Sequence, residues 1–251
     1  MFTSIAMWSL HYSNTRGTEH KIATAFLDLE WQVAHGGTVQ PRVLEPLISL
    51  TLSDEKEDWE IVKIYIEKLV WLLSHKFTRV QFQSAWAIAN LALVDEDSRI
   101  KIHEAGGTRT LLEWYNEMEF VVQLEALAAL ANLSLSIEVC NAMVLQHKCI
   151  PFLLQIIVSD KIKHSHFALV SLGNISRVEA FRPMIVASGG MHVLVGCIMT
   201  RDYLKLKFSA QALANLLLSE SNAIDEAFGL RGVIQRICKI AGRAEADTQR
   251  E

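Results

Sequence analysis

The sequence predicts an all-α solenoid, a stack of short helices built from one repeated unit. Two observations predict this fold: a set of asparagines recurs at a constant spacing, and the apolar residues between them have helical periodicity. The composition agrees, because a chain that is 51% hydrophobic has enough apolar surface to fold. Only four prolines and twelve glycines occur in 251 residues, which disfavours a β fold with many turns.

The repeat is visible in four similar segments, each of which contains an asparagine followed by leucine or isoleucine. These asparagines are Asn90, Asn132, Asn174 and Asn215. They lie 42, 42 and 41 residues apart, and Ser49 takes the same place 41 residues before the first of them. Glycines follow the same period at Gly107, Gly190 and Gly232, with Cys149 in the remaining position. Two independent sets of residues with one spacing indicate a structural repeat.

Each repeat is predicted to be helical throughout. Over residues 122–135, apolar residues occur at 124, 127, 130, 131 and 135, which is helix spacing and not strand alternation. A shorter helix is predicted over 98–104, closed by Gly106 and Gly107, since glycine readily takes the left-handed conformation that ends a helix. A further helix is predicted over 108–117. Two or three helices in about 42 residues are typical of armadillo and HEAT repeats.

The chain resembles armadillo repeats in particular. The strings VQLEALAALANLS (122–134) and SRIKIHEAGG (98–107) are similar to the third helix of that repeat and the first helix of the next one. The resemblance implies a right-handed armadillo-repeat solenoid, with five full repeats over residues 40–242. Residues 1–39 are then an N-terminal cap and partial repeat, and residues 243–251 are a C-terminal tail. We therefore expect a single domain over residues 1–251.

The resemblance also implies a binding surface, because the third helices of armadillo repeats line a concave groove into which the repeated asparagine projects. A carboxamide both donates and accepts, so it can bracket a peptide unit whatever the side chain. The alternative is that these asparagines bridge neighbouring repeats or face water. Side chains one and two turns earlier complete the predicted groove. Its residues are Ser49, Trp86, Asn90, Glu125, Asn132, Phe167, Val170, Asn174, Phe208, Gln211 and Asn215.

The residues of this groove indicate the kind of partner. Nuclear-import receptors of the family repeat a Trp-x-x-x-Asn pair, and here only Trp86 and Asn90 form one. Because the pair is not repeated, a soluble peptide-signal receptor of that type is disfavoured. It is kept as the alternative to a protein–protein interaction scaffold. The small, apolar centre around Val170 and Phe167 better suits an amphipathic helix or an apolar peptide. Nucleic acid is not expected as a partner, because the net charge is −4.

No catalytic motif is present, so we expect neither an enzyme nor a cofactor. Cys140, His147 and Cys149 are three candidate metal ligands without an obvious fourth, so no metal site is expected. The four cysteines show no paired spacing, which indicates reduced thiols in a cytoplasmic protein.

Residues 7–14, 28–37 and 46–54 resemble the armadillo-repeats-only proteins of apicomplexan parasites. This resemblance implies a non-enzymatic scaffold that tethers rhoptry organelles to the apical motor machinery. The partners it implies are a myosin motor, an adenylate cyclase and a dedicated interacting protein. Those proteins are acylated at a Gly/Cys-rich N-terminus, whereas this sequence begins Met1-Phe2. We therefore expect attachment to the cytosolic face of the rhoptry membrane only through an acylated segment absent here, and no vesicle binding by the chain as given.

Overall fold

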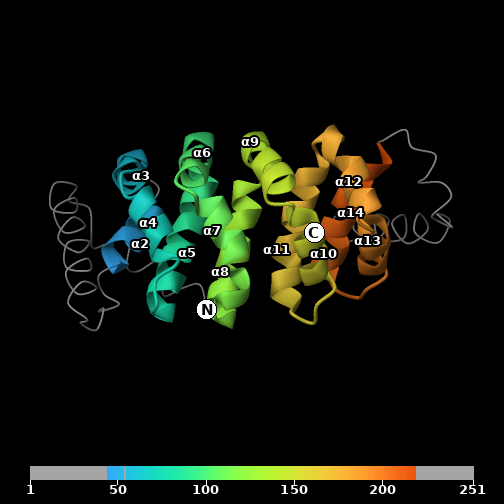
Figure 1. Ribbon diagram of the computed structural model, residues 1–251, viewed down its shortest axis with the longest axis horizontal. Coiled ribbons are helices and arrows are strands. Elements are labelled where there is room, and N and C mark those ends of the chain that lie inside the picture. Colours follow the sequence, from blue (N-terminus) through green and yellow to red (C-terminus); the bar gives the residue numbers. More distant parts are fainter. Residues whose placement is uncertain (1–43, 54, 219–251) are drawn as a thin grey trace, which may run out of the picture. The chain divides into compact units, whose positions relative to one another are not determined.

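The computed structural model of the protein describes residues 44–53 and 55–218, and the regular elements in these ranges are all helical (Figure 1). This confirms the predicted fold class. The expected N-terminal cap and partial repeat (1–39), the C-terminal tail (243–251) and Gly232 lie outside the described residues. The chain divides after Val139 into two compact units, which we call unit 1 and unit 2 and describe separately. A single domain over the whole chain therefore stays a prediction.

From residue 44 on, the described part of unit 1 contains two successive sets of three helices, preceded by α2. In order the elements are α2 (Glu45–Thr51), α3 (Lys56–Lys63), α4 (Ile66–Leu72), α5 (Thr78–Val94), α6 (Glu96–Glu104), α7 (Gly107–Glu113), the 3-10 helix η3 (Tyr115–Glu117) and α8 (Phe120–Leu133). Helix α9 (Ile137–Asn141) spans the division between the units. The long third helices α5 and α8 pack against each other, and α5 also packs against α2.

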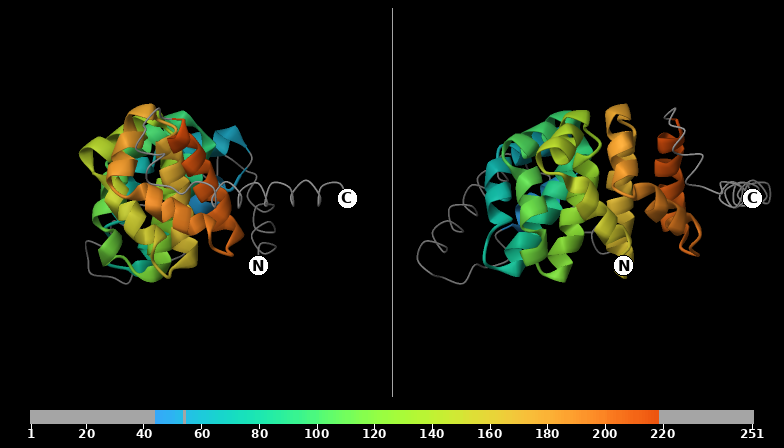
Figure 2. Two further views of the ribbon diagram at one scale, coloured as in Figure 1. Left: turned by 90° about the vertical axis from the view of Figure 1, so that its right-hand side faces the viewer. Right: turned by 45° about the vertical axis from the view of Figure 1, so that its right-hand side comes forward.

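Unit 2 repeats this organisation. Its elements are the π-helix η4 (Ala142–Gln146), α10 (Cys149–Ile157), α11 (Ile162–Ser176), the 3-10 helix η5 (Glu179–Phe181), α12 (Arg182–Ala187), α13 (Gly190–Ile198) and α14 (Tyr203–Leu217). The third helices α11 and α14 pack against each other, while α10 packs on α11 and α13 packs on α14. Further views show helices in successive layers within each unit (Figure 2).

The apolar spacing in the sequence accounts for these helices. On α8, Val122, Leu127, Leu130 and Leu133 are fully buried, and the small side chains of α5 and α8 between such residues allow close packing. The helix predicted over 98–104 is α6, which begins earlier because the Asp95 carboxylate accepts a hydrogen bond from the Ser98 backbone N–H at 2.8 Å. The helix predicted over 108–117 divides at Trp114 into α7 and η3.

The turn between the first and second helix of a repeat depends on two adjacent residues. Gly106 and Gly189 have φ angles of 85° and 80°, the left-handed region in which glycine has no steric penalty. The following glycines allow close packing, since a Cβ on Gly107 would lie 2.7 Å from the Ile102 carbonyl oxygen. In the intervening repeat, Lys148 takes the left-handed conformation with φ of 49° and Cys149 follows it.

None of the described helices is by itself long and apolar enough to cross a bilayer. Two pairs of consecutive helices would be long and apolar enough together, but each pair is sharply bent.

Candidate functional site

The asparagine ladder of unit 1 uses its amide nitrogens to join neighbouring repeats. Asn90 on α5 donates from Nδ2 to the Thr51 hydroxyl of α2 at 3.0 Å. Asn132 on α8 donates from Nδ2 to the Ala89 carbonyl oxygen of α5 at 2.8 Å. Both side chains are half-buried. Asn90 therefore joins α5 to α2, and Asn132 joins α8 to α5.

Unit 2 repeats this arrangement at its last third helix. Asn215 on α14 donates from Nδ2 to the Ser176 hydroxyl at 2.9 Å and to the Gly173 carbonyl oxygen at 3.3 Å. Both acceptors belong to α11. Asn174 on α11 is almost entirely buried, with 8% of its surface exposed. A buried carboxamide is less able to reach a ligand than the half-buried ones at the other positions.

The sequence left open whether the asparagines face a ligand or bridge neighbouring repeats. In Asn90, Asn132 and Asn215 the amide nitrogen forms a bridge between repeats. Within the described residues, no donor pairs with the carboxamide oxygens of Asn90, Asn132 and Asn215. A carbonyl-type oxygen has two lone pairs, so each of these half-buried side chains keeps an acceptor for the N–H of a ligand. Their assignment to a binding surface stays a prediction.

The hydroxyl partners of the asparagines were missed by sequence reasoning. Thr51 and Ser176 each lie two residues after the asparagine position of their repeat, and each is 39 residues before the asparagine it meets. At the same position after Asn90 stands Ala92, which has no hydroxyl, and there Asn132 bonds to a backbone carbonyl instead. Ser49, which we placed in the ladder, donates to the Glu45 carbonyl of its own helix at 2.9 Å.

The remaining predicted residues of unit 1 include an unpaired carboxylate. Trp86 is half-buried on α5, one turn before Asn90, with its ring 6.1 Å from that of Phe82. Glu125 is half-buried on α8, two turns before Asn132 and therefore on the same face of the helix. Burial raises the pKa of Glu125, and no described residue forms an ion pair or hydrogen bond with it. Burial therefore opposes the charged form of this carboxylate, and a cation supplied by a ligand would compensate its charge.

The predicted residues of unit 2 form a more apolar surface. Phe167 and Val170 are half-buried on α11, and Phe208 is half-buried on α14. Gln211, one turn before Asn215, is exposed. The Lys207 ammonium lies 5.8 Å from the centre of the Phe208 ring, a cation–π geometry. The difference between the two units suits different parts of a ligand, or different ligands.

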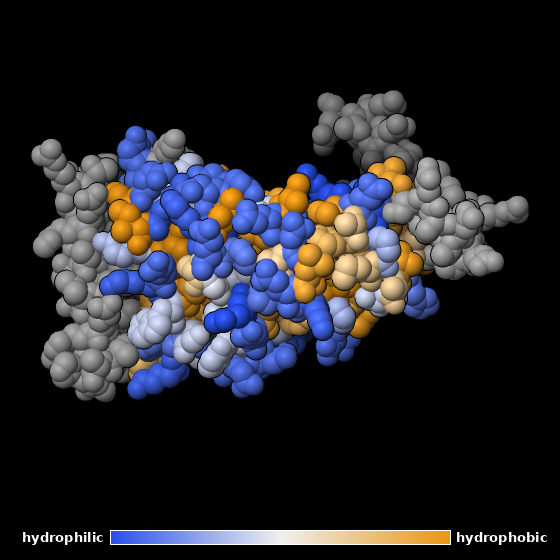
Figure 3. Space-filling view, turned by 45° about the horizontal axis from the view of Figure 1, so that its top comes forward, coloured by the Kyte–Doolittle hydropathy of each residue, from blue (hydrophilic) through white to orange (hydrophobic). Residues whose placement is uncertain are grey.

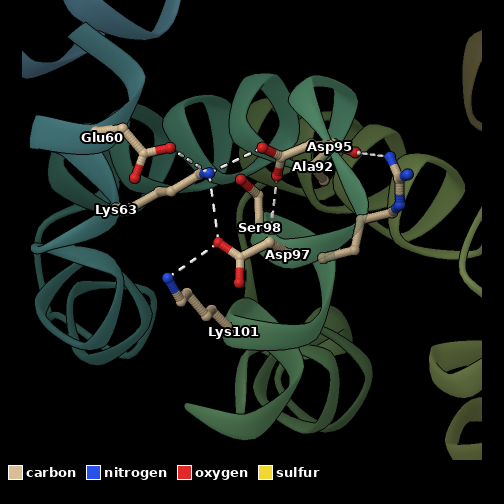
Figure 4. Close-up of polar contacts among 8 residues, drawn as sticks. Glu60, Lys63, Ala92, Asp95, Asp97, Ser98 and Lys101 are labelled. Atoms are coloured by element: carbon tan, nitrogen blue, oxygen red, sulfur yellow. Dashed lines mark hydrogen bonds and ion pairs between the residues drawn. The ribbon is translucent and has the colours of Figure 1, made fainter. Parts of the chain in front are cut away.

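A polar cluster around Lys63 was not predicted from the sequence (Figure 4). Lys63 is 8% exposed, and its Nζ lies 2.9 Å from Glu60, 2.8 Å from Asp95 and 3.3 Å from Asp97. Burial opposes the charge of Lys63, but its hydrogen bonds to Asp95 and Glu60 outweigh this and hold its pKa well above the usual value. Burial likewise opposes the charge of Asp95, whose bonds to Lys63 and Ser98 lower its pKa to about 2. The cluster joins α3 to the junction of α5 and α6, so its role is structural.

A cavity of about 330 Å³ lies beside this cluster and away from the predicted binding residues. It is lined by Lys63, Ile64, Ile66, Glu67, Lys101, Glu104 and Ala105. Lys63 and Lys101 already have carboxylate partners, so the charge that the lining offers to a ligand is that of Glu67 and Glu104.

In the part of the chain that the structure describes, no group of three His, Cys, Asp or Glu side chains is arranged so that it could hold a metal ion. Cys140 and Cys149 are buried as free thiols. Burial raises the pKa of Cys149 to about 12, so this thiol is protonated and a poor nucleophile at neutral pH.

Comparison with family models identifies the repeat. Residues 65–93, which comprise α4 and nearly all of α5, match the model of the Armadillo/beta-catenin-like repeat. The fold is an armadillo-repeat fold. No curated protein matches the sequence.

Three solved structures similar to this chain are an engineered protein and two designed armadillo-repeat proteins. An engineered protein is 26% identical with a TM-score of 0.67, over 72% of this chain and 74% of that one. A computationally designed armadillo-repeat protein for modular peptide recognition is 18% identical, with a TM-score of 0.73 over 88% and 90% of the two chains. A designed armadillo-repeat protein in complex with the peptide (KR)4 is 21% identical, with a TM-score of 0.70 over 83% and 88%. The likeness to the last two establishes the armadillo fold alone.

Proposed function

We propose that this armadillo-repeat protein is a non-enzymatic scaffold that binds extended protein segments along its third helices. The observation that carries the proposal is Glu125, a half-buried carboxylate without a described partner on the same helix face as Asn132. The Asn132 carboxamide oxygen accepts a peptide N–H, and Glu125 receives a Lys or Arg side chain of the same ligand. The designed armadillo protein whose ligand is (KR)4 supports a basic peptide as a ligand of this fold.

Unit 2 has a different preference in this proposal. Its half-buried Phe167, Val170 and Phe208 accept apolar side chains, and the exposed Gln211 and the Asn215 oxygen remain available to a peptide backbone. Each such hydrogen bond contributes only about 0.5–1.5 kcal/mol net. Several contacts in register are therefore needed for useful affinity.

The binding test compares Glu125→Gln with the unchanged chain, using a fluorescent peptide in which lysines and arginines alternate with apolar residues. We expect Glu125→Gln to weaken binding about tenfold, because a charge-assisted bond is lost. The same change should leave the melting temperature unchanged or raise it, since it removes a buried, uncompensated charge. The matched control is Glu117→Gln, an exposed carboxylate elsewhere in unit 1, which should change neither property. Full binding by Glu125→Gln would contradict the proposed site.

We further propose, from the resemblance of residues 7–14, 28–37 and 46–54, that the scaffold belongs to the armadillo-repeats-only proteins of apicomplexan parasites. Its role would then be to tether rhoptries at their cytosolic face, with a myosin motor, an adenylate cyclase and a dedicated interacting protein as partners. Proximity labelling by the tagged protein in such a parasite tests this. Enrichment of rhoptry-surface and motor proteins is expected, and labelling spread evenly through the cytoplasm would contradict it.

Trp86 and Asn90 keep open the alternative of a nuclear-import type receptor, because they form the Trp-x-x-x-Asn pair of that class. That alternative predicts tight binding of lysine-rich nuclear signals that is lost in Trp86→Ala. The scaffold proposal predicts that such signals bind no more tightly than other peptides in which basic and apolar residues alternate.

A further inference from the structure

Two helix starts in unit 2 place exposed apolar side chains at one edge. Val158 and Ile162 flank the connection from α10 to α11, and Met199 and Tyr203 flank the connection from α13 to α14. These four side chains are between 57% and 66% exposed, and neighbouring Leu204 is 40% exposed. The two connections occupy equivalent places in successive repeats, 41 residues apart.

The two connections are also joined directly. His166 Nε2, on the second turn of α11, lies 2.8 Å from the Asp202 carboxylate at the start of α14. The other Asp202 oxygen accepts from the backbone N–H groups of Leu204 and Lys205 at 2.9 and 3.0 Å, and so caps α14. The hydrogen bond between His166 and Asp202 links the start of α14 to the second turn of α11. We call residues 158–163 and 199–207 together the basic edge.

The charge of this edge is opposite to that of the whole chain. It contains five basic residues, Lys161, Lys163, Arg201, Lys205 and Lys207. Its two acidic residues are Asp160 and Asp202, and Asp202 already accepts hydrogen bonds within the protein. The chain as a whole has a net charge of −4, so positive charge is concentrated here.

Exposed apolar residues alone would not distinguish this edge, because hydrophobic areas interrupt a hydrophilic face elsewhere on the molecule (Figure 3). The equivalent start of α8 in unit 1 shows the contrast. It exposes Phe120 and Val121 to 55% and 51%, but is preceded by Glu117 and Glu119 and by no lysine. Of the starts of α8, α11 and α14, only the two in unit 2 therefore combine exposed apolar side chains with basic neighbours.

We propose that the basic edge binds the surface of an anionic membrane. Apolar side chains of this kind enter the boundary between headgroups and acyl chains, while Lys and Arg contact lipid phosphates and carboxylates. Tyr203 suits this boundary because its ring is apolar and its hydroxyl is polar. A purely acidic protein segment would satisfy the lysines but leave the apolar tips in water, so a bilayer fits both features. The residues of the basic edge are not among those assigned to the peptide-binding surface, but Tyr203 and Lys207 precede Gln211 on the same face of α14.

The test is co-sedimentation of the full chain with vesicles of phosphatidylcholine alone and with an equimolar mixture of phosphatidylcholine and phosphatidylserine. We expect binding to the mixed vesicles, which reverses the expectation of no vesicle binding that was drawn from the sequence. Binding to neutral vesicles should be slight, and added salt should weaken binding to the mixed ones. Ile162→Ser/Tyr203→Ser and Lys163→Glu/Arg201→Glu should each reduce binding to mixed vesicles by roughly tenfold or more. Phe120→Ser/Val121→Ser, equally exposed in unit 1, is the matched control and should bind as the unchanged chain does.

Circular dichroism and thermal melting of each variant show whether it remains folded, as expected for exposed positions. Absence of binding by the unchanged chain would overturn the proposal, as would equal binding by folded edge variants. Binding to soluble poly-glutamate without binding to mixed vesicles would also overturn it and indicate an acidic protein partner instead.

Discussion

At the scale of single residues, each half-buried asparagine of the ladder has two ends with different tasks. The amide nitrogen of Asn132 holds the Ala89 carbonyl of the preceding third helix, while its oxygen has no described donor. We expect Asn132→Ala to lower the free energy of unfolding by about 1 kcal/mol, because one bridging hydrogen bond is lost. The higher helix propensity of alanine offsets a few tenths of a kcal/mol of this. Urea unfolding followed by circular dichroism measures the change.

The control for this prediction is Gln211→Ala on α14, since Gln211 is exposed and makes no described bridge. Its effect should stay within about 0.5 kcal/mol, as for most surface changes. If Asn132→Ala were as stable as the unchanged chain but bound peptide poorly, the asparagine would serve the ligand and not the fold.

The period of the ladder was predictable from the sequence, but the partners of its members were not identified. Asparagine spacing alone is compatible with a ligand-facing and with a bridging side chain. The deciding signal is the hydroxyl of Thr51 or Ser176 two residues after the asparagine position, together with its replacement by Ala92 in one repeat. This signal becomes meaningful only when the register between neighbouring third helices is known.

At the scale of helices, the Lys63 cluster fixes α3 against the junction of α5 and α6. Lys63→Met would leave Glu60 and Asp95 without their cation, and Asp97 with Lys101 alone. We expect the free energy of unfolding at neutral pH to fall by about 2 kcal/mol, less than for a fully buried pair because the carboxylates are partly exposed. Lys101→Met is the control, since Lys101 is half-exposed and pairs with Asp97 only along its own helix.

The cluster also predicts a dependence on pH. The pKa of Asp95 is about 2 in the folded protein against an ordinary value of 3.8, so the unfolded chain binds more protons between these values. Stability from Asp95 is therefore present above about pH 4 and is lost as the pH falls towards 2. The unfolding free energy of the unchanged chain should fall more steeply across this window than that of Lys63→Met. Equal slopes would show that Lys63 does not set the Asp95 pKa.

The helices themselves were largely predictable, because apolar periodicity and the paired glycines are local signals. The cluster was not, because Lys63 and Asp95 are 32 residues apart and meet only when α3 packs against the junction of α5 and α6. The left-handed conformation of Lys148 was also not predicted, because lysine has no preference for that backbone geometry.

At the scale of the whole molecule, the net charge of −4 conceals a strong local imbalance. The sequence alone led us to expect no vesicle binding, because the lysines and arginine of the basic edge lie in two segments, each with only two or three basic residues. The fold brings the segments together through His166 and Asp202. The expectation that nucleic acid is not a partner rested on the net charge of the whole chain. The charge of the surface that meets a partner depends instead on which segments the repeats bring together.

The final prediction concerns whether the two compact units unfold as the single domain expected from the repeat. Asn132 lies in unit 1 and Asn215 in unit 2, and their hydrogen-bond acceptors are different residues. We expect Asn132→Ala/Asn215→Ala to show one urea transition, because neighbouring repeats of a solenoid normally unfold cooperatively. Its loss of stability should equal the two single losses within about 0.5 kcal/mol, since changes without shared partners are additive. Two separate transitions, each moved by only one of the substitutions, would contradict the single domain and establish unit 1 and unit 2 as independently folding parts.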